Sequence, residues 1–127
     1  MKLLICGGRD LDEEIAFDRI SWFIVKWDDV WTEKGLCLIE KIIHGGAKGA
    51  DTAAGRYARA FSIKEEIFLP DWERFGKSAG MIRNKKMLTE GQPDVILALP
   101  GGNGTKNMVA LGEAAGIPIY RIGVNND

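Results

Sequence analysis

Residues 97–105 read Leu-Ala-Leu-Pro-Gly-Gly-Asn-Gly-Thr, and this segment predicts the architecture of the whole chain. The apolar run from Val95 to Leu99 is typical of a buried strand, and Pro100 ends it. Glycines then occupy three of the next four positions, and a helix is predicted to begin at about Thr105. Because a backbone without Cβ atoms can approach a ligand closely, and a helix start carries unpaired N–H groups, this turn is suited to bind a phosphate. A tight strand-to-helix connection without a ligand is the alternative.

Short apolar runs alternate with helical periodicity along the rest of the chain. Strands are predicted at 2–6, 38–43, 62–69, 94–99 and 117–122. Helices are predicted at 11–33, 51–61, 78–89 and 106–115, and the segment 70–77 is predicted to be a loop. The first of these is either one long helix or two helices separated near Asp28-Asp29. Asp10 and Glu13 have the spacing of a capping box for the first helix. The pattern predicts one α/β domain over residues 1–127, a Rossmann-like, doubly wound, mainly parallel sheet of about five strands with helices on both faces.

In such a sheet the turns that follow the strands lie along the same edge. Four glycine-bearing segments are therefore predicted to converge there: residues 7–8, 45–49, 76–80 and 101–104. Open α/β sheets bind ligands at this edge, where the strand order reverses. The dinucleotide fingerprint is absent, because no Gly-Xaa-Gly-Xaa-Xaa-Gly follows the first strand.

Four motifs carry a family resemblance that spans positions 3 to about 122. The Pro-Gly-Gly-Xaa-Gly-Thr turn at 100–105 resembles that of the lysine-decarboxylase-like LOG family and of the wider SLOG superfamily, which includes DprA-type DNA-processing proteins. Three further motifs are similar to the small, single-domain YspA-type branch: Gly-Gly-Arg-Asp at 7–10, His-Gly-Gly-Ala-Lys-Gly-Ala-Asp at 44–51 and Gly-Lys-Ser-Ala-Gly-Met-Ile-Arg-Asn at 76–84. The resemblance implies a Rossmann-like domain with a nucleotide-related ligand.

Arg83 is the first candidate for a phosphate contact, because a guanidinium group can bind an anion through two N–H groups. The resemblance implies that Arg83 and Asn84 lie at the ligand. Lys85 and Lys86 follow directly, so a solvated helix face is the alternative for this segment. The candidate ligand-binding residues together are Gly8, Arg9, Gly45, Gly46, Lys77, Ser78, Arg83, Asn84, Gly101, Gly102, Gly104 and Thr105.

Asp51 is the candidate catalytic carboxylate, which would activate water, and binding of ribose hydroxyls is the alternative role. An aspartate at the start of a helix also stabilises the helix dipole. His44 is the only histidine, and we expect a packed, hydrogen-bonded ring rather than a catalytic base.

Met108 marks a departure from the LOG pattern. In LOG-type phosphoribohydrolases, which release a base from a nucleoside 5′-monophosphate, the turn continues Gly-Thr-Xaa-Xaa-Glu and that glutamate is catalytic. Cleavage of an N-glycosidic bond needs a carboxylate near the cationic transition state, so turnover is expected to be slow or absent. If the rest of the pocket matches that of the LOG enzymes, a glutamate introduced at Met108 is expected to face the sugar and to raise base release.

The bulk properties are those of an ordinary globular domain. Seventeen basic and eighteen acidic residues give a net charge of −1, which does not favour general nucleic-acid binding. Cys6 and Cys37 lie in apolar surroundings typical of reduced thiols. No signal peptide is recognised and no apolar run approaches the roughly 20 residues of a membrane span, so a cytoplasmic location is expected. One histidine and no clustered cysteines predict no metal site, and no cofactor is predicted.

Three functions stay open. The first is a binding module for a nucleoside phosphate or a molecule like NAD or ADP-ribose. The alternative is an N-glycosidase that uses Asp51 or Asp10 as its carboxylate. Single-stranded DNA binding is less favoured, although Arg74, Lys77, Arg83, Lys85 and Lys86 form a local basic cluster. The expected partner is a nucleotide-derived small molecule rather than a membrane or a nucleic acid. The first helix, with Trp22, Trp27 and Trp31, could also form a homodimer contact.

Overall fold

The computed structural model describes residues 1–33 and 39–124, and within 28–33 it describes the backbone alone. Cys37, the side chain of Trp31 and the chain end at 125–127 therefore lie outside the described residues. Five strands form one sheet in the order β3-β2-β1-β4-β5, and every neighbouring pair is parallel. The strands are β1 (Lys2–Cys6), β2 (Lys41–His44), β3 (Lys64–Ile67), β4 (Val95–Ala98) and β5 (Ile119–Arg121).

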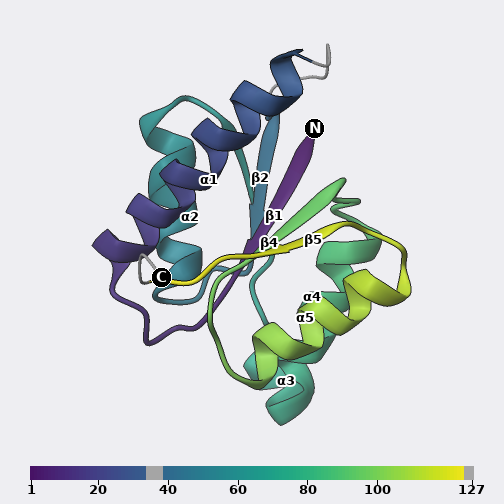
Figure 1. The fold of residues 1–127 in the computed structure, drawn as a ribbon. Helices are drawn as coiled ribbons and strands as arrows, with labels where there is room; N and C mark the ends of the chain where they lie inside the picture. Colours follow the sequence, from purple (N-terminus) through teal and green to yellow (C-terminus); the bar gives the residue numbers. More distant parts are fainter. Residues whose placement is uncertain (34–38, 125–127) are drawn as a thin grey trace.

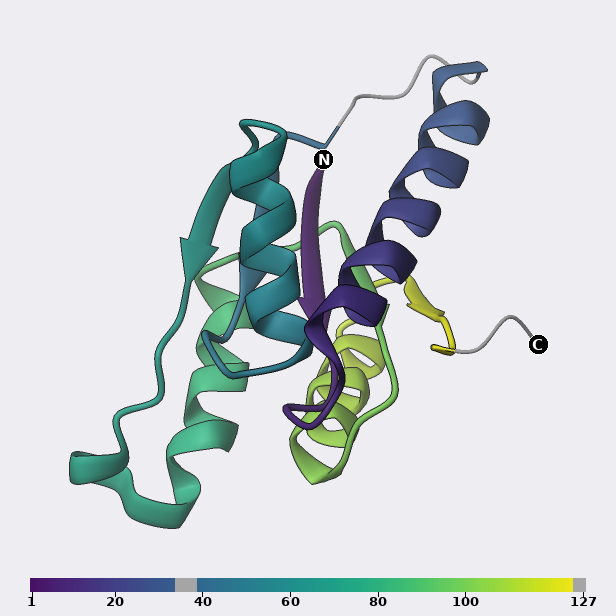
Figure 2. The same cartoon turned by 90° about the vertical axis from the view of Figure 1, so that its left-hand side faces the viewer.

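The helices form a layer on each face of the sheet (Figures 1 and 2). One layer consists of α1 (Glu13–Glu33) and α2 (Ala50–Ala60), and the other of α4 (Ala79–Thr89) and α5 (Asn103–Ala114). A short helix, α3 (Trp72–Phe75), and a 3₁₀ turn, η1 (Gly76–Ser78), precede α4. The predicted Rossmann-like α/β architecture is thus confirmed, with all five strands parallel.

Two apolar clusters fill the space between the sheet and the helices, because successive side chains of a strand point to opposite faces. Leu3 and Ile5 of β1 pack toward α1 and α2, whereas Leu4 and Cys6 pack toward α4 and α5. The same alternation occurs in β4, where Val95 and Leu97 belong to the first cluster and Ile96 and Ala98 to the second. All of these side chains are buried. An uninterrupted apolar strand is what a parallel sheet covered on both faces requires.

The strand order reverses between β1 and β4, at the centre of the sheet. The chain first adds β2 and β3 on one side of β1, then returns to place β4 and β5 on the other. The register pairs Cys6 with Ala98, so β1 and β4 end level with each other. The turns that follow these two strands therefore leave the sheet side by side.

Three local predictions differ from the structure. The first helix begins at Glu13, and Asp12, not Asp10, caps it by accepting a hydrogen bond from the Ile15 N–H at 3.0 Å. Part of the predicted loop at 70–77 is helical, because the Asp71 side chain accepts a hydrogen bond from the Arg74 N–H at 3.1 Å and starts α3. Helix α5 begins at residue 103, before the predicted start. Among the described residues, no helix is long and apolar enough to cross a membrane.

Candidate functional site

The turns after β1, β2 and β4 contact one another at the carboxyl edge of the sheet. The Gly8 N–H donates to the Pro100 carbonyl at 2.8 Å, and the Gly8 carbonyl accepts from the Ala50 N–H at 3.2 Å. Gly49 permits this contact, since it has a φ of +72° and a Cβ at this position would collide with the Gly8 carbonyl oxygen. The backbone of these three turns therefore forms one continuous rim.

Arg83 and Asn84 attach α4 to that rim. The Arg83 Nη1 donates to the Gly45 carbonyl at 2.6 Å, and its Nε donates to the Asn84 Oδ1 at 3.0 Å. The Asn84 Nδ2 donates to the Gly104 carbonyl and to the Asn107 Oδ1, both at 3.0 Å. Asn84 is only 3% exposed, so its amide links α4 to the first turn of α5 from a buried position. The predicted contact of Asn84 with a ligand stays a prediction.

Arg83 retains part of its hydrogen-bonding capacity. The side chain is half-buried, and burial lowers the pKa of its guanidinium group although the charge of Asp51 acts in the opposite direction. Within the part of the chain that the structure describes, the Arg83 Nη2 makes no hydrogen bond or ion pair. This nitrogen can therefore donate to a ligand without breaking the contact to Gly45.

The turn at residues 101–104 is exposed throughout. Gly102 is the N-cap residue of α5 and supplies no side-chain hydrogen bond to the helix. A Cβ built on Gly102 or on Gly104 would meet nothing within 4 Å, so open space lies above both residues. Gly101 differs, because its Cβ would collide with the Thr105 side chain and lie 2.7 Å from the Gly8 nitrogen.

The other predicted ligand residues lie either on the turns that form the rim or in η1. Arg9 is exposed directly after Gly8, and Gly46 is exposed after β2. Lys77 and Ser78 are exposed in η1, and among the described residues no hydrogen bond or ion pair joins them to the three turns. Figure 2 shows that α3, which precedes η1 and α4 in the chain, lies away from the sheet at the N-terminal end of α4. The fourth glycine segment, 76–80, thus connects to the rim through the residues that follow it.

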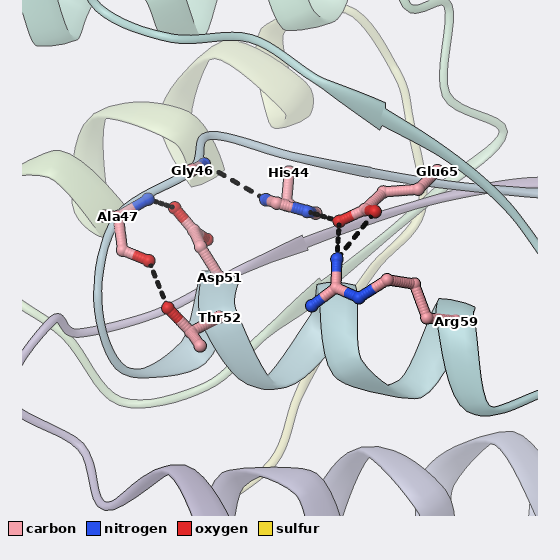
Figure 3. A network of polar contacts seen from close by, with 7 residues as sticks. All are labelled: His44, Gly46, Ala47, Asp51, Thr52, Arg59 and Glu65. Carbon is pink, nitrogen blue, oxygen red and sulfur yellow. Dashed lines mark hydrogen bonds and ion pairs between the residues drawn. The ribbon is translucent and has the colours of Figure 1, made fainter.

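His44 is held by hydrogen bonds at both ring nitrogens (Figure 3). The Gly46 N–H donates to His44 Nδ1 at 3.0 Å, which requires that Nδ1 be unprotonated and places the ring proton on Nε2. Nε2 then donates to the Glu65 Oε2 at 2.6 Å. The Arg59 Nη1 contacts both Glu65 oxygens, at 2.8 and 3.0 Å. The expected packed, hydrogen-bonded histidine is confirmed.

Glu65 and Arg59 are members of this network that sequence reasoning missed. Burial acts to raise the pKa of Glu65, but the hydrogen bonds from His44 and Arg59 outweigh it and hold that pKa below its ordinary value. The available signal was an acidic residue inside a predicted strand, where a carboxylate needs a partner.

Asp51 lies beside this network in a cavity of about 280 Å³ between α2 and β3. The side chain is 7% exposed, and its Oδ2 accepts a hydrogen bond from the Ala47 N–H at 3.1 Å. Burial raises the pKa of Asp51 above its ordinary value, although the Ala47 N–H and the positive charge of Arg83 oppose the shift. The nearby Cys6 thiol has a pKa raised to about 12, by burial and by the charge of Asp51. Such a thiol is not a nucleophile.

Met108 is 1% exposed and belongs to the apolar cluster between the sheet and α4 and α5. The expectation that a side chain at this position faces the ligand is therefore wrong. Met108 lies on the face of α5 that packs against Ile96 and Met87. Any catalytic carboxylate must come from elsewhere in the chain.

Gly55 allows Glu65 to reach α2, because a Cβ here would collide with the Glu65 carboxylate and lie 3.1 Å from His44 Nε2. We expect Gly55→Ala to destabilise the protein by about 1 kcal/mol or more, since the loss of charge-assisted hydrogen bonds exceeds the roughly 1 kcal/mol that alanine adds to a helix. In a Glu65→Ala background the same change should be stabilising. Urea unfolding of the four proteins measures the sign in each background. The same sign in both would show that Gly55 does not serve this contact.

Of the two α1 tryptophans whose side chains the structure describes, one lies in the core and the other at the surface. Trp27 is buried at 8% exposure, with its ring 4.8 Å from that of Tyr120. Trp22 is 46% exposed, and the Arg19 guanidinium lies 4.6 Å from its ring centre. A homodimer through this helix stays a prediction, as does the cytoplasmic location.

Two comparisons with known proteins found relatives of this chain. A model of the YspA, cpYpsA-related SLOG family (YAcAr) matches residues 1–75. The Gene 61 protein of Mycobacterium phage D29 is 40% identical over 89 residues, which cover 65% of this chain and 70% of the phage protein. The family match includes the turns after β1 and β2 and Asp51, whereas Arg83 and the 101–105 turn lie beyond it.

Proposed function

Because the chain belongs to the YspA, cpYpsA-related SLOG family, we propose that it binds a nucleotide or a nucleotide-derived ligand at the carboxyl edge of its sheet. The ligand class includes nucleoside phosphates and molecules that resemble NAD or ADP-ribose. The family match supports a nucleotide-related role for the domain, and the geometry of the edge supports the placement of the ligand there.

The observation that carries the proposal is the uncapped, open start of α5. The first N–H groups of a helix have no partner within the helix, and they carry the positive end of its dipole. Gly102 provides no side chain to accept their hydrogen bonds, and the space above Gly102 and Gly104 is free. A phosphate oxygen fits this position in both charge and hydrogen bonding.

Positive side chains at the rim support the same placement. The Arg83 Nη2 remains available for a ligand, and Arg9 is exposed on the turn after β1. The hydrogen bonds made by the backbone of Gly8, Gly45 and Pro100 hold the rim in place in the absence of a ligand.

The proposal is tested by isothermal titration calorimetry with four probes: inorganic phosphate, ribose 5-phosphate, AMP and adenosine. We expect AMP to bind more tightly than adenosine by about tenfold or more, because charge-assisted hydrogen bonds contribute about 1.5–3 kcal/mol. GMP, CMP and UMP extend the panel, since the base is not specified. Equal affinity for AMP and adenosine would contradict a phosphate site, and tight binding of a single-stranded oligonucleotide with a steep salt dependence would favour the DNA reading.

A second function, nucleotide N-glycosidase activity, is favoured by the position of Asp51. A carboxyl group with a raised pKa that lines a cavity is a candidate for acid–base chemistry. If the enzyme reading holds, base release from nucleoside monophosphates, followed by chromatography, should be measurable in the unchanged protein. Asp51→Asn should then remove it while keeping an acceptor for the Ala47 N–H. Base release that survives Asp51→Asn would exclude Asp51 as the catalytic carboxylate. If the unchanged protein releases no base, the enzyme hypothesis fails and only the binding function remains.

A further inference from the structure

A second and larger cavity opens beside the start of α5, on the side of β5. Its volume is about 530 Å³, within the roughly 300–1,000 Å³ of small-molecule sites. The floor and walls are mainly apolar, and they include Ala98, Leu99, Pro100, Val109, Ala110 and Ile122. We call this cavity the β4–β5 groove. It lies on the opposite side of β4 from β1, β2 and the Asp51 cavity.

The groove is continuous with the turn at which we place the phosphate. Pro100 and Thr105, at the two ends of that turn, both line it. A ligand whose phosphate lies over Gly102 can therefore extend into the groove along α5. This continuity favours a single ligand that occupies both the turn and the groove, since a separate protein or lipid partner would not require it.

Charged side chains at the groove favour a polar, anionic ligand with an apolar planar part. Lys106 lines the groove one position after Thr105 and is exposed. The Arg121 Nη2 donates to the Glu113 Oε1 at 2.7 Å, and both side chains are more than half exposed. Glu113 can accept from an exocyclic amino group, and Arg121 can stack on or donate to a heterocycle.

We propose that the β4–β5 groove holds the nucleobase of a nucleotide whose phosphate lies on the 101–105 turn. This inference rests on the proposed function and adds the location of the base. The Asp51 cavity suits a base less well, because it is smaller and is lined by His44, Arg59 and Glu65. The apolar groove instead offers the burial that a planar ring requires.

The test compares two alanines of α5 that are both exposed. Ala110 lines the groove, whereas Ala114, one helical turn later, does not. Ala110→Phe places a ring inside the groove, and Ala114→Phe is the matched control. The probes are ribose 5-phosphate and whichever of AMP, GMP, CMP and UMP binds the unchanged protein most tightly, measured by calorimetry.

We expect Ala110→Phe to weaken the nucleoside monophosphate by about tenfold or more, because the base loses its buried surface. The affinity for ribose 5-phosphate should stay within about twofold, since this probe has no base, and Ala114→Phe should change neither affinity. If the nucleotide binds no more tightly than ribose 5-phosphate, the proposed base site in the β4–β5 groove is wrong. Equal effects of the two phenylalanines would overturn it as well.

The outcomes also separate this inference from the proposed function. Suppose that Gly102→Asp removes the binding of ribose 5-phosphate, but Ala110→Phe does not change the affinity for the nucleotide. This result would support the phosphate site at the 101–105 turn and contradict the base site in the β4–β5 groove. If none of the probes binds, the proposed function fails and the groove fails with it.

Discussion

Gly102→Asp is expected to abolish nucleotide binding while the protein stays folded and becomes slightly more stable. An aspartate at the N-cap accepts hydrogen bonds from the first-turn N–H groups and is more favourable than glycine by about a few tenths of a kcal/mol. The φ of Gly102 is −91°, outside the positive-φ region that favours glycine, and its Cβ would enter open space. The new carboxylate would then occupy the position proposed for the phosphate.

The loss of affinity follows from charge as well as from space. Like charges placed together cost several kcal/mol, so we expect AMP binding to weaken by about 100-fold or more. Calorimetry with AMP measures the affinity, and urea unfolding measures the free energy of unfolding. The opposite signs of the two effects exclude misfolding as the cause of the lost binding.

Gly102→Asn is the matched control for charge. Asparagine caps a helix as well as aspartate does and has nearly the same size, but it carries no charge. Its effect on AMP binding should fall between those of glycine and aspartate. If both variants bind AMP as tightly as the unchanged protein, the 101–105 turn is a connector, and the nucleotide site must lie elsewhere on the edge.

The architecture could be predicted because each strand carries its own signal. Leu3 to Cys6 and Val95 to Leu99 are apolar at every position, which only a strand covered on both faces tolerates at that length. The alternation with helices then requires parallel strands, and parallel strands bring their following turns to one edge. The convergence of the turns after β1, β2 and β4 was thus a consequence of topology, which needs no knowledge of side-chain contacts.

The details that the sequence did not predict depend on contacts or on short-range geometry. Helix α3 spans four residues, too few to show a helical period, and Asp71 starts it through a local hydrogen bond. The hydrogen bonds of Asn84 to Gly104 and Asn107 join segments that are distant in sequence. The order of residues along the chain does not indicate that the Asn84 amide forms hydrogen bonds within the protein.

Met108 shows the limit of a motif comparison. The spacing Gly-Thr-Xaa-Xaa-Xaa fixes a position along the chain, but the phase of the helix decides which face that position occupies. Residues 108 and 112 are both buried, whereas 106, 110 and 113 are exposed, and this helical pattern was available in the sequence. The apolar spacing was a better guide to the orientation of residue 108 than the resemblance.

Met108→Glu is therefore expected to destabilise the protein rather than to create a hydrolase. The carboxylate would replace a side chain that is 1% exposed and belongs to an apolar cluster. An uncompensated buried charge costs roughly 3–5 kcal/mol, a large part of the roughly 5–15 kcal/mol that holds a domain folded. We expect a loss of this size in the free energy of unfolding at pH 7, measured in urea.

The loss should depend on pH, and its direction identifies the cause. Burial would raise the pKa of the new glutamate in the folded protein above the ordinary value of about 4.3. Below that value both states are protonated and the charge penalty disappears. As the pH rises, the unfolded chain ionises first, so the folded state of Met108→Glu loses stability relative to it until the raised pKa is passed. Met108→Gln should show a smaller loss without this pH dependence, and Met108→Leu should lose less than about 1.5 kcal/mol. A Met108→Glu protein that is as stable as Met108→Leu at pH 7 and releases base from nucleoside monophosphates would place residue 108 at the ligand and contradict its position in the core.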